Sequence, residues 1–139
     1  MKKFAQIRLS VPVDEAGKLL LPDGLRIDGD FHLGDKSVVK ALPENLTVGR
    51  DLNLGYSDIT ALPVNLNVGR NLDLNYSAVK ALPEYLTVGG SLYLEYSAIT
   101  VLPEHLTVGG DLFVTGTAIT TIPEGVKVGG RIYGLKKAA

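Results

Sequence analysis

The sequence predicts an all-β fold, a parallel β-solenoid of about six coils of 20 residues behind an N-terminal β-hairpin cap. Two observations carry this prediction. A unit of the form LPxxLxVGGxLxLxxSxIxx recurs along most of the chain, and a fixed period of this length is typical of a repeat architecture. No stretch has a sustained helical period, and the proline and glycine residues of each unit would interrupt a helix.

The repeat divides the 139 residues into three parts. Residues 1–20 combine an alternating segment, FAQIRLSVPV, with the turn-forming DEAGK. They predict the hairpin cap, which would cover the edge of the first coil. Residues 21–135 form the coils, and residues 136–139 are a C-terminal tail. The coils start at Leu21, Leu42, Leu62, Leu82, Leu102 and Ile122.

Each coil contains three short apolar segments separated by corners. In the second coil they are residues 46–48, 52–54 and 57–59, and in each the first and third side chains point to one side of a strand. Proline fixes φ at one corner, and we expect glycine to supply a positive φ at another. One coil cannot bury its apolar side alone. Successive coils therefore stack at about 4.8 Å and bury continuous columns of aliphatic side chains.

The strand core LxLxxSxI, as in LNLGYSDI (residues 52–59) and LYLEYSAI (residues 92–99), resembles the LxLxxNxL core of leucine-rich repeats. The Leu-Pro pair followed by xxL at a 20-residue period is similar to the short bacterial LPX subtype. The pattern differs from that family at two positions. Glycine replaces the leucine that opens the strand, and serine or threonine replaces the asparagine, at Ser57, Ser77, Ser97 and Thr117.

The resemblance covers residues 21–135 and implies a solenoid, either curved like a horseshoe or straighter and triangular. The serine and threonine hydroxyls would bond the neighbouring backbone in place of asparagine. Short proteins with this pattern also resemble proteins of bacteriophages and of mobile bacterial DNA.

The composition argues against several classes of function. The chain has 14 basic and 15 acidic residues, so its net charge does not favour nucleic acid or an anionic membrane. Without cysteine it has no disulfide framework, thiolate metal site or cysteine nucleophile. No apolar run reaches the ~20 residues of a membrane span, and the start, MKKFAQIRLSVPVDEA, lacks the apolar core of a secretory signal. We expect a cytoplasmic protein that binds neither nucleic acid nor membrane.

Catalytic and metal sites also have little support. The two histidines, His32 and His105, lie more than three coils apart, roughly 17 Å or more along the axis at the spacing of stacked strands. The chain has no Ser-His-acid or HExxH arrangement, no calcium-binding GGxGxDx repeat and no phosphate loop. We therefore expect no catalytic residue, no metal and no cofactor.

The outward positions of the coils form columns with one side chain per coil. One column changes from polar to aromatic along the chain, and we expect it to face solvent. Its members are His32, Asn53, Asp73, Tyr93, Phe113 and Tyr133. A second column contains Tyr56, Tyr76 and Tyr96, then Gly116, and it either tucks into a corner or faces solvent. Aromatic columns can serve stability alone, whereas exposed aromatic surface is typical of a recognition site.

Acidic side chains lie beside these columns. Residues 21–130 contain 13 acidic and 7 basic residues. Asp73, Glu95 and Asp111 would either keep a solvated face soluble or steer a partner with a basic surface.

The sequence thus predicts a non-catalytic protein-binding module that uses an exposed strand face. The candidate contacts are Asn53, Tyr56, Asp73, Tyr76, Tyr93, Glu95, Tyr96, Asp111, Phe113 and Tyr133. A small phage-type inhibitor that occludes a host enzyme would be a special case. A glycan-binding surface and a structural spacer without a dedicated partner are the alternatives. The C-terminal coil, guarded by two lysines, is where we expect self-association.

Overall fold

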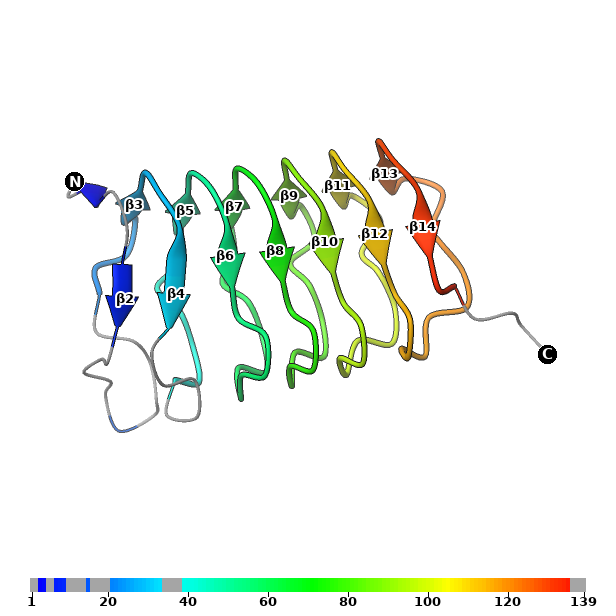
Figure 1. Ribbon diagram of the computed structural model, residues 1–139, viewed down its shortest axis with the longest axis horizontal. Coiled ribbons are helices and arrows are strands. Elements are labelled where there is room, and N and C mark those ends of the chain that lie inside the picture. Colours follow the sequence, from blue (N-terminus) through cyan, green and yellow to red (C-terminus); the bar gives the residue numbers. More distant parts are fainter. Residues whose placement is uncertain (1–2, 5–6, 10–14, 16–20, 34–38, 136–139) are drawn as a thin grey trace.

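The computed structural model describes residues 3–4, 7–9, 15, 21–33 and 39–135, and within these ranges it contains strands and turns but no helix (Figure 1). Most strands are two residues long. The odd-numbered strands are β1 (Lys3–Phe4), β3 (Arg26–Ile27), β5 (Thr47–Val48), β7 (Asn67–Val68), β9 (Thr87–Val88), β11 (Thr107–Val108) and β13 (Lys127–Val128). The even-numbered strands are β2 (Ile7–Leu9), β4 (Phe31–Leu33), β6 (Leu52–Asn53), β8 (Leu72–Asp73), β10 (Leu92–Tyr93), β12 (Leu112–Phe113) and β14 (Ile132–Tyr133).

The strands form two parallel sheets of seven, one strand of each sheet per coil. The first sheet has the order β1-β3-β5-β7-β9-β11-β13, and the second has the order β2-β4-β6-β8-β10-β12-β14. Equivalent residues of successive repeats are partners, as Leu52 with Leu72 and Leu72 with Leu92. The predicted parallel β-solenoid is therefore confirmed.

The core consists of the aliphatic columns that the repeat predicts. The columns at the Leu46, Val48, Leu52, Leu54 and Ile59 positions are buried through four successive coils. A leucine in each rung contacts the leucines above and below it, so burial that a single coil cannot achieve is shared along the axis. This rigid stack fixes the outward side chains of neighbouring coils in register.

The third apolar segment of each coil does not become a regular strand. Between the coils that contain Ala61 and Ala81 this side has one isolated parallel bridge, which joins those two alanines. Nearby backbone bonds run from Ala78 N to Ser57 O and from Lys80 N to Thr60 O. The segment leads into Leu-Pro, and proline has no N–H to donate to a ladder. The third side is thus extended backbone with sparse pairing.

Two short strands precede the first coil. β1 and β2 do not pair with each other: β1 pairs in parallel with β3 of the first sheet, and β2 pairs in parallel with β4 of the second. β1 and β2 thus extend the two sheets by one strand each, because each pairs in parallel with the exposed edge of the strand in the first coil. They still cover that coil. The residues of the predicted turn, apart from Glu15, and the tail 136–139 lie outside the described residues.

The glycine that follows the valine of each unit has a different role from the one predicted. Among the described residues the glycines with positive φ are Gly24, Gly116 and Gly134, so the corner glycines at 49, 69, 89, 109 and 129 do not need left-handed backbone. A Cβ on Gly89 would instead overlap the carbonyl oxygen of Gly69 in the preceding coil. Glycine at this corner lets the backbones of successive coils approach closely.

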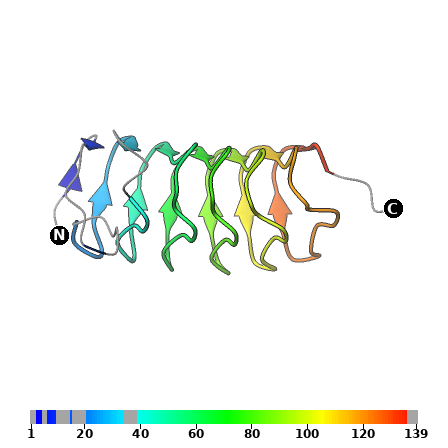
Figure 2. The same ribbon diagram turned by 90° about the horizontal axis from the view of Figure 1, so that it is seen from below.

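The coils follow one another in a straight row rather than around a horseshoe (Figures 1 and 2). The first sheet lies along one side of the row and the second along another. Within the described residues, no helix has the length and apolar character needed to cross a membrane.

Candidate functional site

The predicted aromatic column is brought together on the outward side of the second sheet. Tyr93 is the register partner of Phe113, and Phe113 is the partner of Tyr133. Their ring centroids lie 4.7 Å and 5.0 Å apart, with interplanar angles of 2° and 12°. The rings therefore form one continuous stack along the axis. Tyr93 and Phe113 are half-buried rather than fully facing solvent, and Tyr133 at the end is exposed.

The second column, of Tyr56, Tyr76 and Tyr96, is the more exposed of the two, with exposed fractions of 72%, 49% and 53%. Centroid separations of 4.8 Å and 5.0 Å show that these rings also stack. Each of the three tyrosines has a φ near +60°, a left-handed conformation that is uncommon for a bulky residue. This backbone turns the ring out of the corner, which answers the question that the sequence left open.

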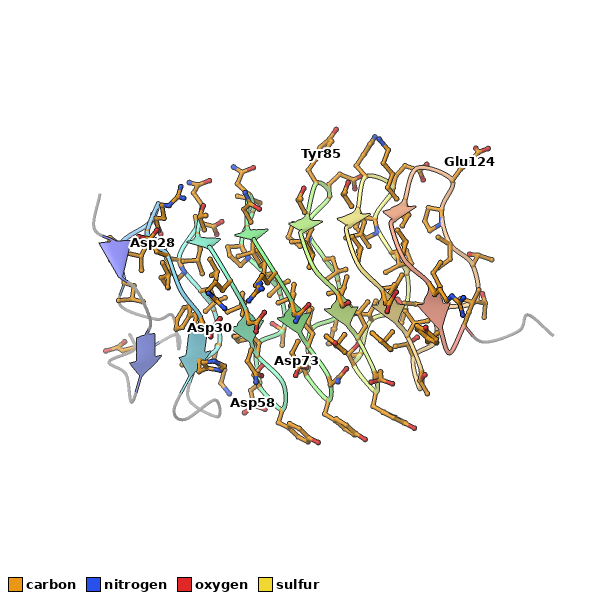
Figure 3. The ribbon with its side chains drawn as sticks, turned by 45° about the horizontal axis from the view of Figure 1, so that its top comes forward. Asp28, Asp30, Asp58, Asp73, Tyr85 and Glu124 are labelled. Atoms are coloured by element: carbon orange, nitrogen blue, oxygen red, sulfur yellow. The ribbon has the colours of Figure 1, made fainter. Side chains whose placement is uncertain are left out.

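The polar members of the predicted site have structural roles in their own turns. Asn53 Oδ1 accepts a hydrogen bond from Gly55 N, and Asp73 Oδ1 accepts one from Asn75 N. These local bonds are typical of Asx turns, in which the side chain mimics a backbone acceptor. Glu95 N in turn donates to Asn75 Oδ1 at 2.7 Å. Asp73 lies on the outward face of the second sheet (Figure 3), and its carboxylate is already committed to the turn through one oxygen.

A ladder of side-chain to backbone hydrogen bonds connects the coils next to this face. Each acceptor receives the N–H of the residue at the same position one coil later. The bonds are Asp51 N to Asp30 Oδ1, Asn71 N to Asp51 Oδ1, Ser91 N to Asn71 Oδ1, Asp111 N to Ser91 Oγ and Arg131 N to Asp111 Oδ1. Asp111, predicted as a partner contact, is therefore part of the connection between coils.

The serine and threonine column at the asparagine position of the leucine-rich repeat is buried. Ser97 Oγ donates to Leu94 O at 2.7 Å, and Thr117 Oγ1 donates to Val114 O. The predicted bonding to neighbouring backbone is confirmed for these two. Ser57 and Ser77 are buried too, but their hydroxyls have no hydrogen-bond partner among the described residues.

One corner contains exposed residues that the sequence analysis did not select. Tyr85 is 71% exposed and stacks on His105, with ring centroids 4.7 Å apart. His105 Nδ1 lies 2.9 Å from Glu84 Oε1. The signal was present in the sequence, because the second residue after the coil proline is, in successive coils, Gly24, Asn45, Asn65, Tyr85, His105 and Gly125. The side chains at this position change from amide to aromatic along the solenoid, so this corner does not present the same surface in every coil.

The last coil is the least buried part of the described solenoid. Ile132 and Leu135 are exposed, while Ile122, Val126 and Val128 are only partly buried. β13 and β14 each pair on one side, with β11 and β12, so their other edges have no strand partner within the described residues.

The described residues contain no group of three or more histidine, aspartate or glutamate side chains placed to hold a metal ion. The two aromatic stacks and the corner around Tyr85 are thus the features of this surface that geometry singles out. Comparison of the chain with protein-family models, with curated proteins and with solved structures finds no match to any of them.

Proposed function

We propose that the protein is a non-catalytic binding module that docks a protein partner on the outward face of the second sheet. The observation that carries this proposal is the pair of aromatic stacks, which occupy different coils and meet in the coil that contains Tyr93 and Tyr96. In that coil Tyr93, Glu95 and Tyr96 point outward around the buried Leu94, so one stack ends beside the residue where the other begins. Tyrosine is enriched among the residues that dominate binding energy at protein interfaces.

The direction of the rings supports a protein partner over a glycan. Sugar recognition by aromatic side chains uses an open ring face, but the faces of Phe113 and Tyr76 are covered on both sides by neighbouring rings. The stacks present ring edges and tyrosine hydroxyls instead. Ring edges and hydroxyls together offer apolar contact and hydrogen bonding, which suits the mixture of apolar and polar groups on a protein surface.

The rigidity of the face also supports this proposal. Hydrogen bonds tie Glu95 to Asn75 and Asp111 to Ser91, so the positions on both sides of the Tyr93 and Phe113 rings are ordered by the fold itself. A face that is already ordered loses little conformational entropy when a partner docks. The carboxylates of Asp73 and Glu95 would favour a partner with a basic surface.

The test is affinity capture from a lysate of the source organism, with the wild type beside a Tyr93→Ser/Phe113→Ser/Tyr133→Ser variant. The matched control is Thr87→Ser/Thr107→Ser/Lys127→Ser, which changes the outward positions of the first sheet in the same three coils. Circular dichroism checks that all three proteins fold. A protein captured by the wild type and the control but lost with the aromatic variant is then purified, and its affinity for each protein is measured directly.

Equal affinity for the aromatic variant and the wild type would contradict this proposal. Binding of an immobilised glycan panel with the same dependence on the rings would favour the glycan alternative, and absence of any ligand would favour the spacer. The narrower proposal, a cytoplasmic phage-type inhibitor that occludes a host enzyme, predicts that the captured partner is an enzyme whose activity falls when the protein is added.

We also propose weak self-association through the C-terminal coil, because Ile132 and Leu135 expose apolar surface beside the edges of β13 and β14 that have no strand partner within the described residues. Sedimentation velocity over a range of concentrations tests it. We expect association by the wild type, loss of association in Ile132→Lys, and no change in Thr100→Lys on the sparsely paired third side. A wild type that stays monomeric at every concentration would contradict the proposal.

A further inference from the structure

A hollow of about 230 Å³ opens on the surface at the corner that precedes the first sheet. Its lining comes from two neighbouring coils: Val64 and Asn65 from one, and Pro83, Glu84 and Tyr85 from the next. None of these residues belongs to the two aromatic stacks. Figure 3 places Tyr85 at this corner, on the same edge of the solenoid as Glu124 and away from Asp73.

The hollow exists because the corner changes conformation between these two coils. Asn45 and Asn65 have φ values of 59° and 60°, whereas Tyr85 and His105 are not among the residues with positive φ. At the earlier type of corner Asn45 N donates to Val64 O of the next coil, but at the corner of Tyr85 Leu86 N donates back to Pro83 O within its own turn. Two corners of different shape do not nest, so a space remains between them.

One wall of the hollow is the uncovered face of an aromatic ring. Tyr85 stacks on His105 of the following coil, while Val64 and Asn65 belong to the preceding coil. The face of Tyr85 that looks toward the hollow is therefore the face opposite His105. The equivalent position in the preceding coil is Asn65, which has no ring to cover this face and whose amide nitrogen donates to Asn45 Oδ1.

The chemical character of the lining is apolar with negative charge at one side. Val64 and Pro83 offer aliphatic surface, and Val64 is itself 60% exposed. Glu84 uses Oε1 toward His105, which leaves Oε2 for another donor. Val64 also stands where the other five coils carry an acidic residue, namely Asp23, Glu44, Glu84, Glu104 and Glu124. The carboxylates along this corner add a field that favours a cation.

We infer that this hollow, here named the corner pocket, is a binding site for an arginine side chain of a protein partner. A guanidinium is planar, stacks on aromatic faces and pairs with carboxylates through several N–H groups. It would continue the stack of Tyr85 and His105 on the open face and donate to Glu84. The aliphatic stem of arginine would lie against Val64 and Pro83. The site is separate from the aromatic stacks, so it does not rest on the proposed function.

The experiment titrates ¹⁵N-labelled protein with N-acetyl-arginine methylamide and follows amide chemical shifts. The matched probe is N-acetyl-citrulline methylamide, which has nearly the same shape and planarity but no charge. We expect shifts centred on Val64, Asn65, Glu84 and Tyr85, and at least fivefold weaker binding of citrulline. N-acetyl-lysine methylamide, a cation without a planar group, should bind at least threefold more weakly than the arginine compound.

Three variants locate the interaction. Glu84→Gln should weaken arginine binding at least fivefold, and Tyr85→Leu, which keeps apolar volume without a planar ring, should weaken it at least threefold. Glu104→Gln lies one coil farther along the same corner and removes the same charge, so it should change the affinity less than twofold.

Thermal unfolding of each variant checks that the fold is retained. Shifts spread evenly along the acidic corner, equal binding of citrulline, or equal losses in the two glutamine variants would each overturn the inference. Because the probe is small and needs no partner, failure here leaves the aromatic face untouched, and failure of affinity capture leaves the corner pocket untouched.

Discussion

The ring of Tyr96 lies against Gly116, the residue at the same position one coil later, and occupies the space that a side chain at Gly116 would need. Gly116 has φ +75°, in the same left-handed region as Tyr96 at +57°. The tyrosine stack therefore ends on a glycine because the last ring folds over it. The left-handed backbone, which costs roughly 1–2 kcal/mol for a residue with a Cβ, is offset at the tyrosines by ring stacking of about 0.5–1.5 kcal/mol per pair.

Gly116→Ala should lower the free energy of unfolding by about 1–3 kcal/mol, from the left-handed backbone and from displacement of the Tyr96 ring. Urea denaturation of Gly116→Ala, Tyr96→Ala and the double variant separates the two causes. We expect a coupling of about 1 kcal/mol in that cycle, since the residues are in contact. Strict additivity of the two changes would show that the ring is not displaced.

Asp51→Ala should destabilise the protein by about 1–2 kcal/mol, because Asn71 N would lose its acceptor between two coils. Asp51→Asn keeps an oxygen at the same place and should cost much less. Chemical denaturation of both variants decides between hydrogen bonding and charge. A cost as large for the asparagine variant as for alanine would mean that the carboxylate charge, rather than the ladder, matters here.

Ser97→Ala should cost about 1 kcal/mol, because the hydroxyl donates to Leu94 O in the core. Ser77→Ala removes a buried hydroxyl without a partner among the described residues, so it should be neutral or slightly stabilising. Melting temperatures of the two variants under identical conditions provide the comparison. The prediction fails if Ser77→Ala is the more damaging change.

Gly89→Ala should destabilise the solenoid by about 2–4 kcal/mol, at the upper end of single substitutions, since its Cβ would overlap the backbone oxygen of Gly69. Gly55→Ala is the matched control. A Cβ at Gly55 would lie 3.3 Å from its nearest neighbours, and other coils carry Asn75, Glu95 or Thr115 at this position. Differential scanning calorimetry should give a near-wild-type transition for the control alone.

The architecture could be predicted from the sequence because the same pattern of apolar and turn-forming residues recurs in every coil. Each apolar column recurs every 20 residues, so the period fixes the register of stacked coils and places Tyr93, Phe113 and Tyr133 in one column. The hairpin predicted for residues 1–20 stays a prediction, because its turn and second arm lie, apart from Glu15, outside the described residues. The parallel pairing of β1 and β2 with the first coil follows from contacts between coils, which the period of the repeat does not specify for residues before it.

The sequence by itself determined which residues share a column, since periodicity is a property of the chain. The tertiary structure decided how each column is used. The left-handed φ of Tyr56 turns its ring outward, the side chains of Asp51 and Asp111 join successive coils, and the change of corner shape beside Tyr85 opens the corner pocket. These outcomes depend on backbone dihedrals and on contacts between coils. Such contacts arise only when neighbouring coils stack, so residue identity and spacing alone do not specify them.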